Sequence, residues 1–371
     1  MKALNISPSI ASVVVIVGSL LCVPSLLSQQ IKIDTASARA VLKSLQDPDL
    51  TYEQAMAVAK LDGNQGMIRE MRDLGEADME EQFVRALLSA SRNQPASDAA
   101  EKDYNFTAVK KAAPAIAMLL DQIEKGLEVD VRARIRPYTP HADTVVLRGL
   151  AVVGGDGGGY AFGGTDFYIN VLNTDEILYA RQTLIHEAFH GVQGAVFQEE
   201  TEDWAKQNAQ SAAVSLGEFC STSAELFKDI KNEGTAMYVG SDEPLKDAKG
   251  ATGQRIYAEY QYYNGHLVDS SGLLEISVAS LQAPKPVPLK TVYRVDFWGK
   301  GVAYYIGNAM TRAIDEQDGA AAVAQALLQP GYEFVLRYTR LVNYGKDDAH
   351  PRLGENTIRA AQLLYNGCRG L

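Results

Sequence analysis

The chain has 371 residues, of which 46% are hydrophobic, and a formal net charge of −11 at pH 7. This length and composition are enough to bury a full core, as one large domain or two modest ones. The acidic balance argues against nucleic acid and anionic membrane surfaces as partners, because both would repel such a chain.

The first 28 residues have the pattern of a secretory signal. Lys2 is the one cationic residue before an apolar run from Ile10 to Leu27, which is broken only by small residues and Pro24. We therefore expect a signal peptide over residues 1–28 and a secreted or periplasmic protein. The alternative is an uncleaved membrane anchor, since about 18 apolar residues are long enough to span a bilayer.

Two cysteines, Cys220 and Cys368, remain after the predicted signal. In an oxidising compartment they are able to pair as a disulfide. Two separately buried thiols are the alternative, and the sequence alone leaves both open.

Residues 29–127 are expected to form an N-terminal helical region. Apolar residues recur at helical spacing in the segments 34–46, 51–61, 76–92 and 106–128. Asp34 and Thr51 are candidate N-caps, and Pro114 predicts a kink or a restart in the last segment. The polar stretch 91–103 contains a proline and predicts a linker.

Residues 128–371 are expected to form the catalytic domain of an α+β protein. The segments 129–139, 143–155 and 159–171 alternate or are β-branched, which predicts two to four strands of a small, mostly antiparallel sheet. The glycine-rich stretch GGDGGGYAFGG lacks a following Gly-Lys-Ser/Thr, so it predicts a turn rather than a phosphate-binding loop. After Asn173 the pattern is mostly helical up to Leu371.

The motif HEAFH, residues 186–190, carries the strongest chemical signal in the chain. His186 and His190 lie four residues apart on one helix face, and Glu187 points to a position from which it can reach a metal-bound water. The alternative is a pair of structural histidines. The apolar neighbours Leu184 and Phe189 favour a metal, because unpaired imidazoles and a carboxylate are costly inside a protein.

A catalytic Zn²⁺ takes three protein ligands and keeps a fourth position open. The candidates for the third ligand are Glu218, Glu225 and Glu233. Glu233 is favoured, because the small residues Gly234 and Ala236 allow its helix to approach the HEAFH helix closely. Glu218 is the second choice.

HEAFH followed by Asn-Glu-Gly-x-Ala at residues 232–236 resembles the gluzincin clan of zinc metallopeptidases, whose third ligand is the Glu of such a segment. The order of GGYAFGGTDFYINV, HEAFH, EGTAMYV and WGKGVAYYIGNAMTRAIDEQDG is similar to a group of secreted bacterial zinc-dependent peptidases, over residues 30–345. The chain departs in two respects. The gap from His190 to Glu233 implies an inserted helix pair, and Met237 stands where many relatives place an aspartate that steadies a ligand histidine.

The resemblance implies hydrolysis of a peptide or protein substrate, with Glu187 as the general base. It also implies a hydrogen-bond donor to the oxyanion from a downstream helix. Tyr304 is favoured for this role, and Tyr305 and His266 are alternatives, although each is also explained as an ordinary packing or surface residue. An edge strand beside the metal is expected to pair with the substrate backbone, and residues 164–171 are expected to be that strand.

Two interpretations from other classes compete with a peptidase. One is a secreted protein in which the zinc site only folds or stores metal, and the other is a helical interaction protein with a fortuitous site. Glu187 favours the enzyme, since a structural site does not need a carboxylate next to its ligands.

Overall fold

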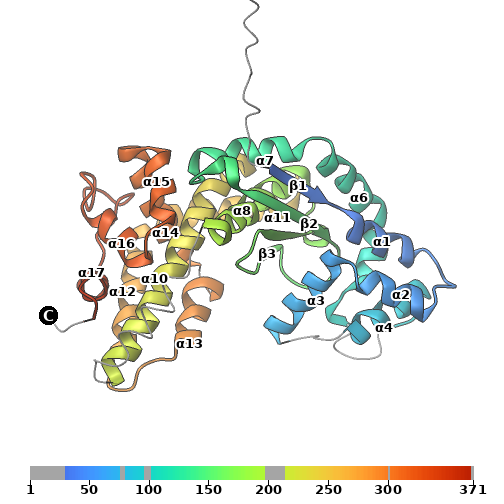
Figure 1. Cartoon of the computed structure of the whole chain (residues 1–371), viewed down its shortest axis with the longest axis horizontal. Coiled ribbons are helices and arrows are strands. Elements are labelled where there is room, and N and C mark those ends of the chain that lie inside the picture. The colour runs from blue at the N-terminus through green and yellow to red at the C-terminus, as the bar shows by residue number, and fades with distance from the viewer. Residues whose placement is uncertain (1–29, 76–79, 96–101, 197–213, 300, 369–371) are drawn as a thin grey trace, which may run out of the picture.

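The computed structural model describes residues 30–75, 80–95, 102–196, 214–299 and 301–368. The first helices gather at one end of the molecule and the last helices at the other, with the sheet and the HEAFH helix between them (Figure 1). The fold is α+β and mostly helical, as predicted. The predicted signal lies outside the described residues. Within those residues, no helix has the length and apolar character needed to cross a membrane.

The described part of the chain forms one four-stranded sheet in the order β1-β2-β4-β3. The pairings β1–β2 and β2–β4 are parallel, and only β3 runs antiparallel, against β4. The prediction of a mostly antiparallel sheet is therefore wrong, and the sheet is mixed. Two of the three pairings among the described strands are parallel, and one of them involves β1, a strand that was not predicted and that a long helical segment connects to β2. The strands are β1 (Gln30–Asp34), β2 (Val146–Val152), β3 (Gly159–Ala161) and β4 (Asp166–Asn170).

The edge of the sheet beside the HEAFH helix is β3, not the expected segment 164–171. That segment becomes β4, which lies between β2 and β3. A turn with Gly163 at a φ of +76° separates β3 from β4 within the predicted segment 159–171. Tyr160 of β3 pairs with Tyr168 of β4, and their rings stack with centroids 4.9 Å apart.

The segment 129–139 is helical, so the strand predicted there is wrong. It forms α7 (Leu127–Ile135) and a short 3-10 turn. Leu127, Val131 and Ile135 are all buried, and their spacing of four makes an apolar stripe on a helix. The alternating charges resemble a strand locally, but acidic residues in the first turn and arginines in the last turn complement the helix dipole.

Four of the N-terminal helices follow the predicted segments closely, whereas the helix over Asp62–Leu74 falls between two of those segments and was not predicted. Thr51 caps its helix through a capping box with Gln54. Thr35, rather than Asp34, is the N-cap of α1, although the Asp34 carboxylate accepts a 2.8 Å hydrogen bond from the Ala36 N–H. The predicted linker lies partly outside the described residues. The helices are α1 (Ala36–Leu45), α2 (Tyr52–Ala59), α3 (Asp62–Leu74), α4 (Glu80–Ser91) and α6 (Phe106–Glu124), which continues through Pro114.

The second half is helical, as predicted. Helix α8 runs on to Val196 and α10 starts at Val214, so the inserted helix pair expected between the two ligand helices falls on residues 197–213, which lie outside the described residues. The helices are α8 (Ile177–Val196), α10 (Val214–Gly240), α11 (Ala251–Asn264), α12 (Leu267–Leu281), α13 (Leu289–Tyr293), α14 (Val302–Asp318), α15 (Ala320–Leu327), α16 (Gly331–Thr339) and α17 (Glu355–Tyr365).

Helix α10 crosses α14 at very close range. A Cβ added to Gly234 would lie 2.3 Å from the backbone of Gly307, and one added to Gly307 would lie 2.4 Å from the carbonyl oxygen of Ile230. The small residue after Glu233 therefore serves contact with α14 rather than the predicted contact with the HEAFH helix. At the C-terminal end of α10, the Arg134 guanidinium donates to the carbonyls of Tyr238 and Val239. These hydrogen bonds satisfy terminal carbonyl groups of the helix.

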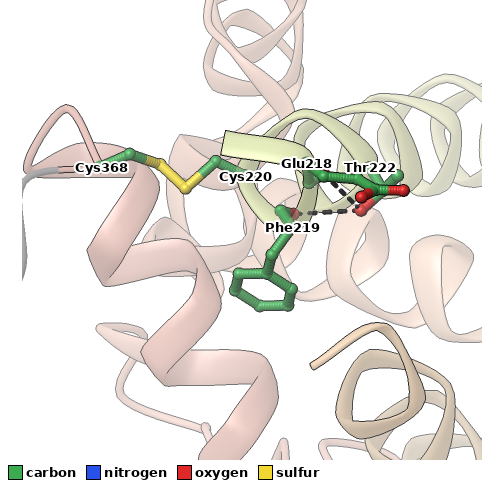
Figure 2. The surroundings of a disulfide bond; sticks show 5 residues. All are labelled: Glu218, Phe219, Cys220, Thr222 and Cys368. Atoms are coloured by element: carbon green, nitrogen blue, oxygen red, sulfur yellow. Dashed lines mark hydrogen bonds between the residues drawn. A yellow bond between two sulfur atoms is a disulfide. The ribbon is translucent and has the colours of Figure 1, made fainter. Parts of the chain in front are cut away.

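A disulfide joins Cys220, near the start of α10, to Cys368, which follows α17 (Figure 2). Their Cα atoms are 6.5 Å apart and both residues are buried. The sequence left this pairing open. The bond ties the end of the described chain to the helix that carries Glu233.

Replacing both Cys220 and Cys368 by serine should lower the free energy of unfolding by about 2–4 kcal/mol, because the bond closes a long loop in the unfolded chain. Urea unfolding with intact and doubly substituted protein measures this change. Because Glu233 lies several turns away, bound zinc should be retained. An unchanged urea midpoint would contradict a stabilising role.

Candidate metal and catalytic centre

Helices α8 and α10 bring His186, His190 and Glu233 together. The two Nε2 atoms are 3.1 Å apart, and a Glu233 carboxylate oxygen lies 3.5 Å from that of His186 and 3.3 Å from that of His190. In the part of the chain that the structure describes, this is the one group of three such residues whose ligand atoms all lie within 4.8 Å of one another. Two imidazole nitrogens and a carboxylate oxygen match the donor set of a zinc site.

The hydrogen bonds of Gln193 orient the ring of His190. The Gln193 amide donates to the Asn232 carbonyl at 2.8 Å and to the Thr235 hydroxyl at 2.9 Å. That hydroxyl itself donates to the Asn232 carbonyl, so both groups act as acceptors. The Gln193 oxygen must then face His190 Nδ1, which lies 2.8 Å away. A neutral His190 therefore carries its proton on Nδ1 and keeps the Nε2 lone pair for a metal.

Gln193 fills a role that the sequence left unassigned. Met237, at the position where the resemblance implies a supporting aspartate, packs in a small apolar cluster with Leu267 and Tyr305. Gln193 lies only three residues after His190, on the same helix face. That three-residue spacing is the signal in the sequence that points to Gln193.

The position along α10 distinguishes the three candidate glutamates. Glu225 and Glu218 precede Glu233 by about 12 Å and about 22 Å along the helix, at 1.5 Å per residue. Figure 2 shows Glu218 beside the disulfide end of α10, and Glu225 is exposed. Only Glu233 of the three lies with both histidines.

The charges at the centre are strongly coupled. Burial alone raises the pKa of Glu233, but the two imidazoles, through charge and hydrogen bonds, bring it well below its usual range. Burial lowers the pKa of His190, whereas the Glu233 carboxylate raises it, with a net result of about 9. The centre therefore attracts positive charge.

Glu187 lies beside the ligands and against the edge strand. Its side chain is only 7% exposed, and burial raises its pKa. A Cβ added to Gly159 of β3 would lie 2.6 Å from the Glu187 Cγ atom, so only glycine allows this approach without a shift. A carboxylate with a raised pKa, held next to the ligands, suits transfer of a proton near neutral pH.

The structure separates the three candidate donors. Tyr304 lies at the centre, where burial and the Glu233 carboxylate, its hydrogen-bond partner, raise its pKa well above the ordinary value. Tyr305 instead stacks on Tyr263 with ring centroids 4.5 Å apart. His266 is exposed and lies over Tyr262, outside the described lining of either cavity at the centre. Tyr293 lines the same cavity as Tyr304 and was not predicted.

The centre lies between two cavities that open on either side of Glu187. The larger has a volume of about 1100 Å³, with α3 on one wall, α10 and α13 on another, and β3 beside α8. The smaller, of about 610 Å³, lies between α8 and α11. Five residues line both: Gly159, His186, Glu187, Trp298 and Tyr304.

Residues 56–347 match the family described as "Putative zinc dependent peptidase (DUF5700)". The chain belongs to this family. The matched span contains the histidines, Glu187, Glu233 and Tyr304, so the family description and the geometry refer to the same part of the molecule. No curated protein and no solved structure matches the chain.

Glu233→Ala should weaken zinc binding far more than Glu225→Ala, because only Glu233 lies within reach of both histidines. Zinc content after dialysis, measured by elemental analysis, gives the comparison, and Glu225→Ala is the matched control on the same helix. Equal zinc retention in the two variants would contradict the assignment of the third ligand.

Gln193→Leu should weaken zinc binding roughly 10- to 100-fold, because His190 loses the acceptor that fixes its ring. Gln193→Glu should recover part of this affinity, since a carboxylate still accepts from Nδ1. Titration with a competing chelator measures the affinity, and thermal unfolding of the metal-free variants separates it from stability. Equal affinity of the leucine variant and the unchanged protein would argue against the role of Gln193.

Proposed function

We propose that the chain is a secreted, gluzincin-type zinc peptidase in which His186, His190 and Glu233 hold the metal and Glu187 is the general base. One observation carries this proposal: three metal-ligand side chains and a buried glutamate converge where two cavities meet. The family description supports the same activity at a coarser level.

In the proposed reaction the bound metal and Glu187 have separate roles. A Zn²⁺ bound there supplies Lewis acidity, which makes a water more acidic and polarises the scissile carbonyl. Glu187 takes the proton of the attacking water and then delivers it to the leaving amine. Burial favours this exchange, because it raises the carboxylate pKa toward neutrality.

Tyr304 is the proposed donor to the oxyanion that forms on the substrate carbonyl. Its hydroxyl lies beside Glu233, and burial with the nearby carboxylate keeps it protonated over the working pH range. Tyr293 lines the same cavity and is the second candidate for this role.

The edge strand β3 is the proposed binding site for the substrate backbone. On one side it pairs with β4, and its residues also line the larger cavity beside Glu187. An extended substrate peptide could pair with the outer edge of β3 through main-chain hydrogen bonds. Its backbone would then pass next to Glu187. The proposed partners are therefore unfolded segments of peptides or proteins.

A zinc site that serves only folding or storage is the competing function. Structural zinc sites are closed by four protein ligands. Within the described residues the cluster has three, and it opens onto both cavities. The disulfide between Cys220 and Cys368 supports the proposed secretion, because such bonds persist in oxidising compartments.

Glu187→Gln should retain zinc but lose hydrolysis by about 100-fold or more, because the amide keeps the shape and removes the base. The rate is measured with an unfolded protein substrate, and zinc by elemental analysis of the same sample. Glu225→Gln is the matched control and should keep the full rate. Unchanged turnover in Glu187→Gln would leave only a binding or structural site.

A further inference from the structure

The smaller cavity contains a buried acid that the proposed catalytic steps do not use. Asp242 follows the C-terminal end of α10 and is only 4% exposed. Its carboxylate lines the cavity that also contacts His186 and Glu187, and its Oδ1 atom has no hydrogen-bond partner. A buried carboxylate oxygen without a hydrogen-bond partner is costly, so a cation entering the cavity would offset that cost.

The charge of the cavity wall is one-sided. Besides Glu187 and Asp242, the lining includes Glu259 of α11, and it contains no lysine or arginine among the residues that the structure describes. Glu259 lies near the surface, where it pairs with Arg255 at 2.8 Å. The wall therefore attracts positive charge, and Asp242 provides the buried end point.

The other walls fit the stem of a long cationic side chain. Tyr263 and Tyr305 stack with ring centroids 4.5 Å apart, and Tyr179 and Trp298 complete an aromatic lining. Aromatic faces attract ammonium and guanidinium groups, and they pack well against the methylene groups that precede them.

Hydrogen bonds fix the position of the cavity wall that α11 forms. Asp175 and Glu176, just before α8, accept from the N–H groups of Thr252, Lys249 and Gly250 at the start of α11. These bonds fix α11 beside the helix that carries Glu187. A preformed pocket loses little freedom on binding and therefore discriminates well.

We propose that this cavity is a subsite for a lysine or arginine side chain of the substrate next to the scissile bond, with Asp242 as the specificity-determining residue. The proposal rests on the proposed peptidase function, because a peptide lying along β3 across Glu187 would place a neighbouring side chain there. It narrows the substrate class to peptides with a cationic residue adjacent to the cleaved bond.

The test compares two sets of quenched fluorescent peptides that differ only by arginine or norleucine at each position around the cleavage site. The unchanged protein should prefer arginine at one position adjacent to the cleaved bond. Asp242→Asn should reduce the arginine-to-norleucine rate ratio roughly 10- to 100-fold, the usual effect of removing a charged hydrogen bond. Glu243→Gln, which removes the same charge at an exposed neighbour outside the lining, should leave the ratio unchanged.

Two results would overturn the subsite. The first is hydrolysis by the unchanged protein without preference for a cationic residue. The second is an equal loss of both substrates in Asp242→Asn together with a loss of zinc. Asp242 interacts electrostatically with His186, and that second result would mean that it only steadies this ligand.

A binding experiment separates the subsite from the catalytic proposal. Zinc-loaded Glu187→Gln protein is titrated calorimetrically with the arginine and norleucine peptides, with and without Asp242→Asn. Tighter binding of the arginine peptide that depends on Asp242 supports the subsite, even if no peptide is hydrolysed and the proposed peptidase function fails. Equal affinities for the two peptides would overturn the subsite, even if hydrolysis is observed.

Discussion

The close crossing of α10 and α14 is the constraint on which the site depends. Gly234 and Gly307 allow the two backbones to touch, and no larger residue fits at either position. Glu233 precedes the first glycine and Tyr304 lies one turn before the second, so the same contact that packs the helices brings together the proposed ligand Glu233 and the proposed donor Tyr304. Arg134 and the disulfide then hold the two ends of α10.

Several acidic residues with little exposure to solvent gather around the site. Glu187 and Asp242 are buried, and the Glu233 side chain, which is 17% exposed, lies beside two imidazoles. Burial also raises the pKa of Asp229, one turn before Glu233, to about 7. A protein gains no stability from such a concentration of acids. Its presence at the meeting point of two cavities is therefore better explained by a bound cation and by cationic substrate groups.

The sheet positions the helix that carries the HEAFH motif but provides none of the proposed ligands or catalytic side chains. Strands β1, β2 and β4 are parallel and lie beside α8, and among the described residues the antiparallel β3 is the edge strand next to Glu187. Helix α3, from the first half of the chain, forms the far wall of the larger cavity. The site thus draws on segments from both halves of the sequence, which explains why the family match covers most of the chain.

The sequence by itself determined the mainly helical α+β class, the HEAFH motif and the shortlist of glutamates, because helix periodicity and ligand spacing are local properties. The strand predicted over residues 129–139 was wrong, because the alternating charges resemble a strand pattern. The four-residue spacing of Leu127, Val131 and Ile135 indicates a helix only once these residues are known to be buried. Only the tertiary structure decided the pairing of the strands, the edge position of β3, the disulfide and the roles open to Gln193 and Asp242. Each of these depends on burial or on contacts between segments far apart in the chain. The spacing of neighbouring residues does not encode such contacts, although the three-residue spacing of His190 and Gln193 was a local signal for that one pair.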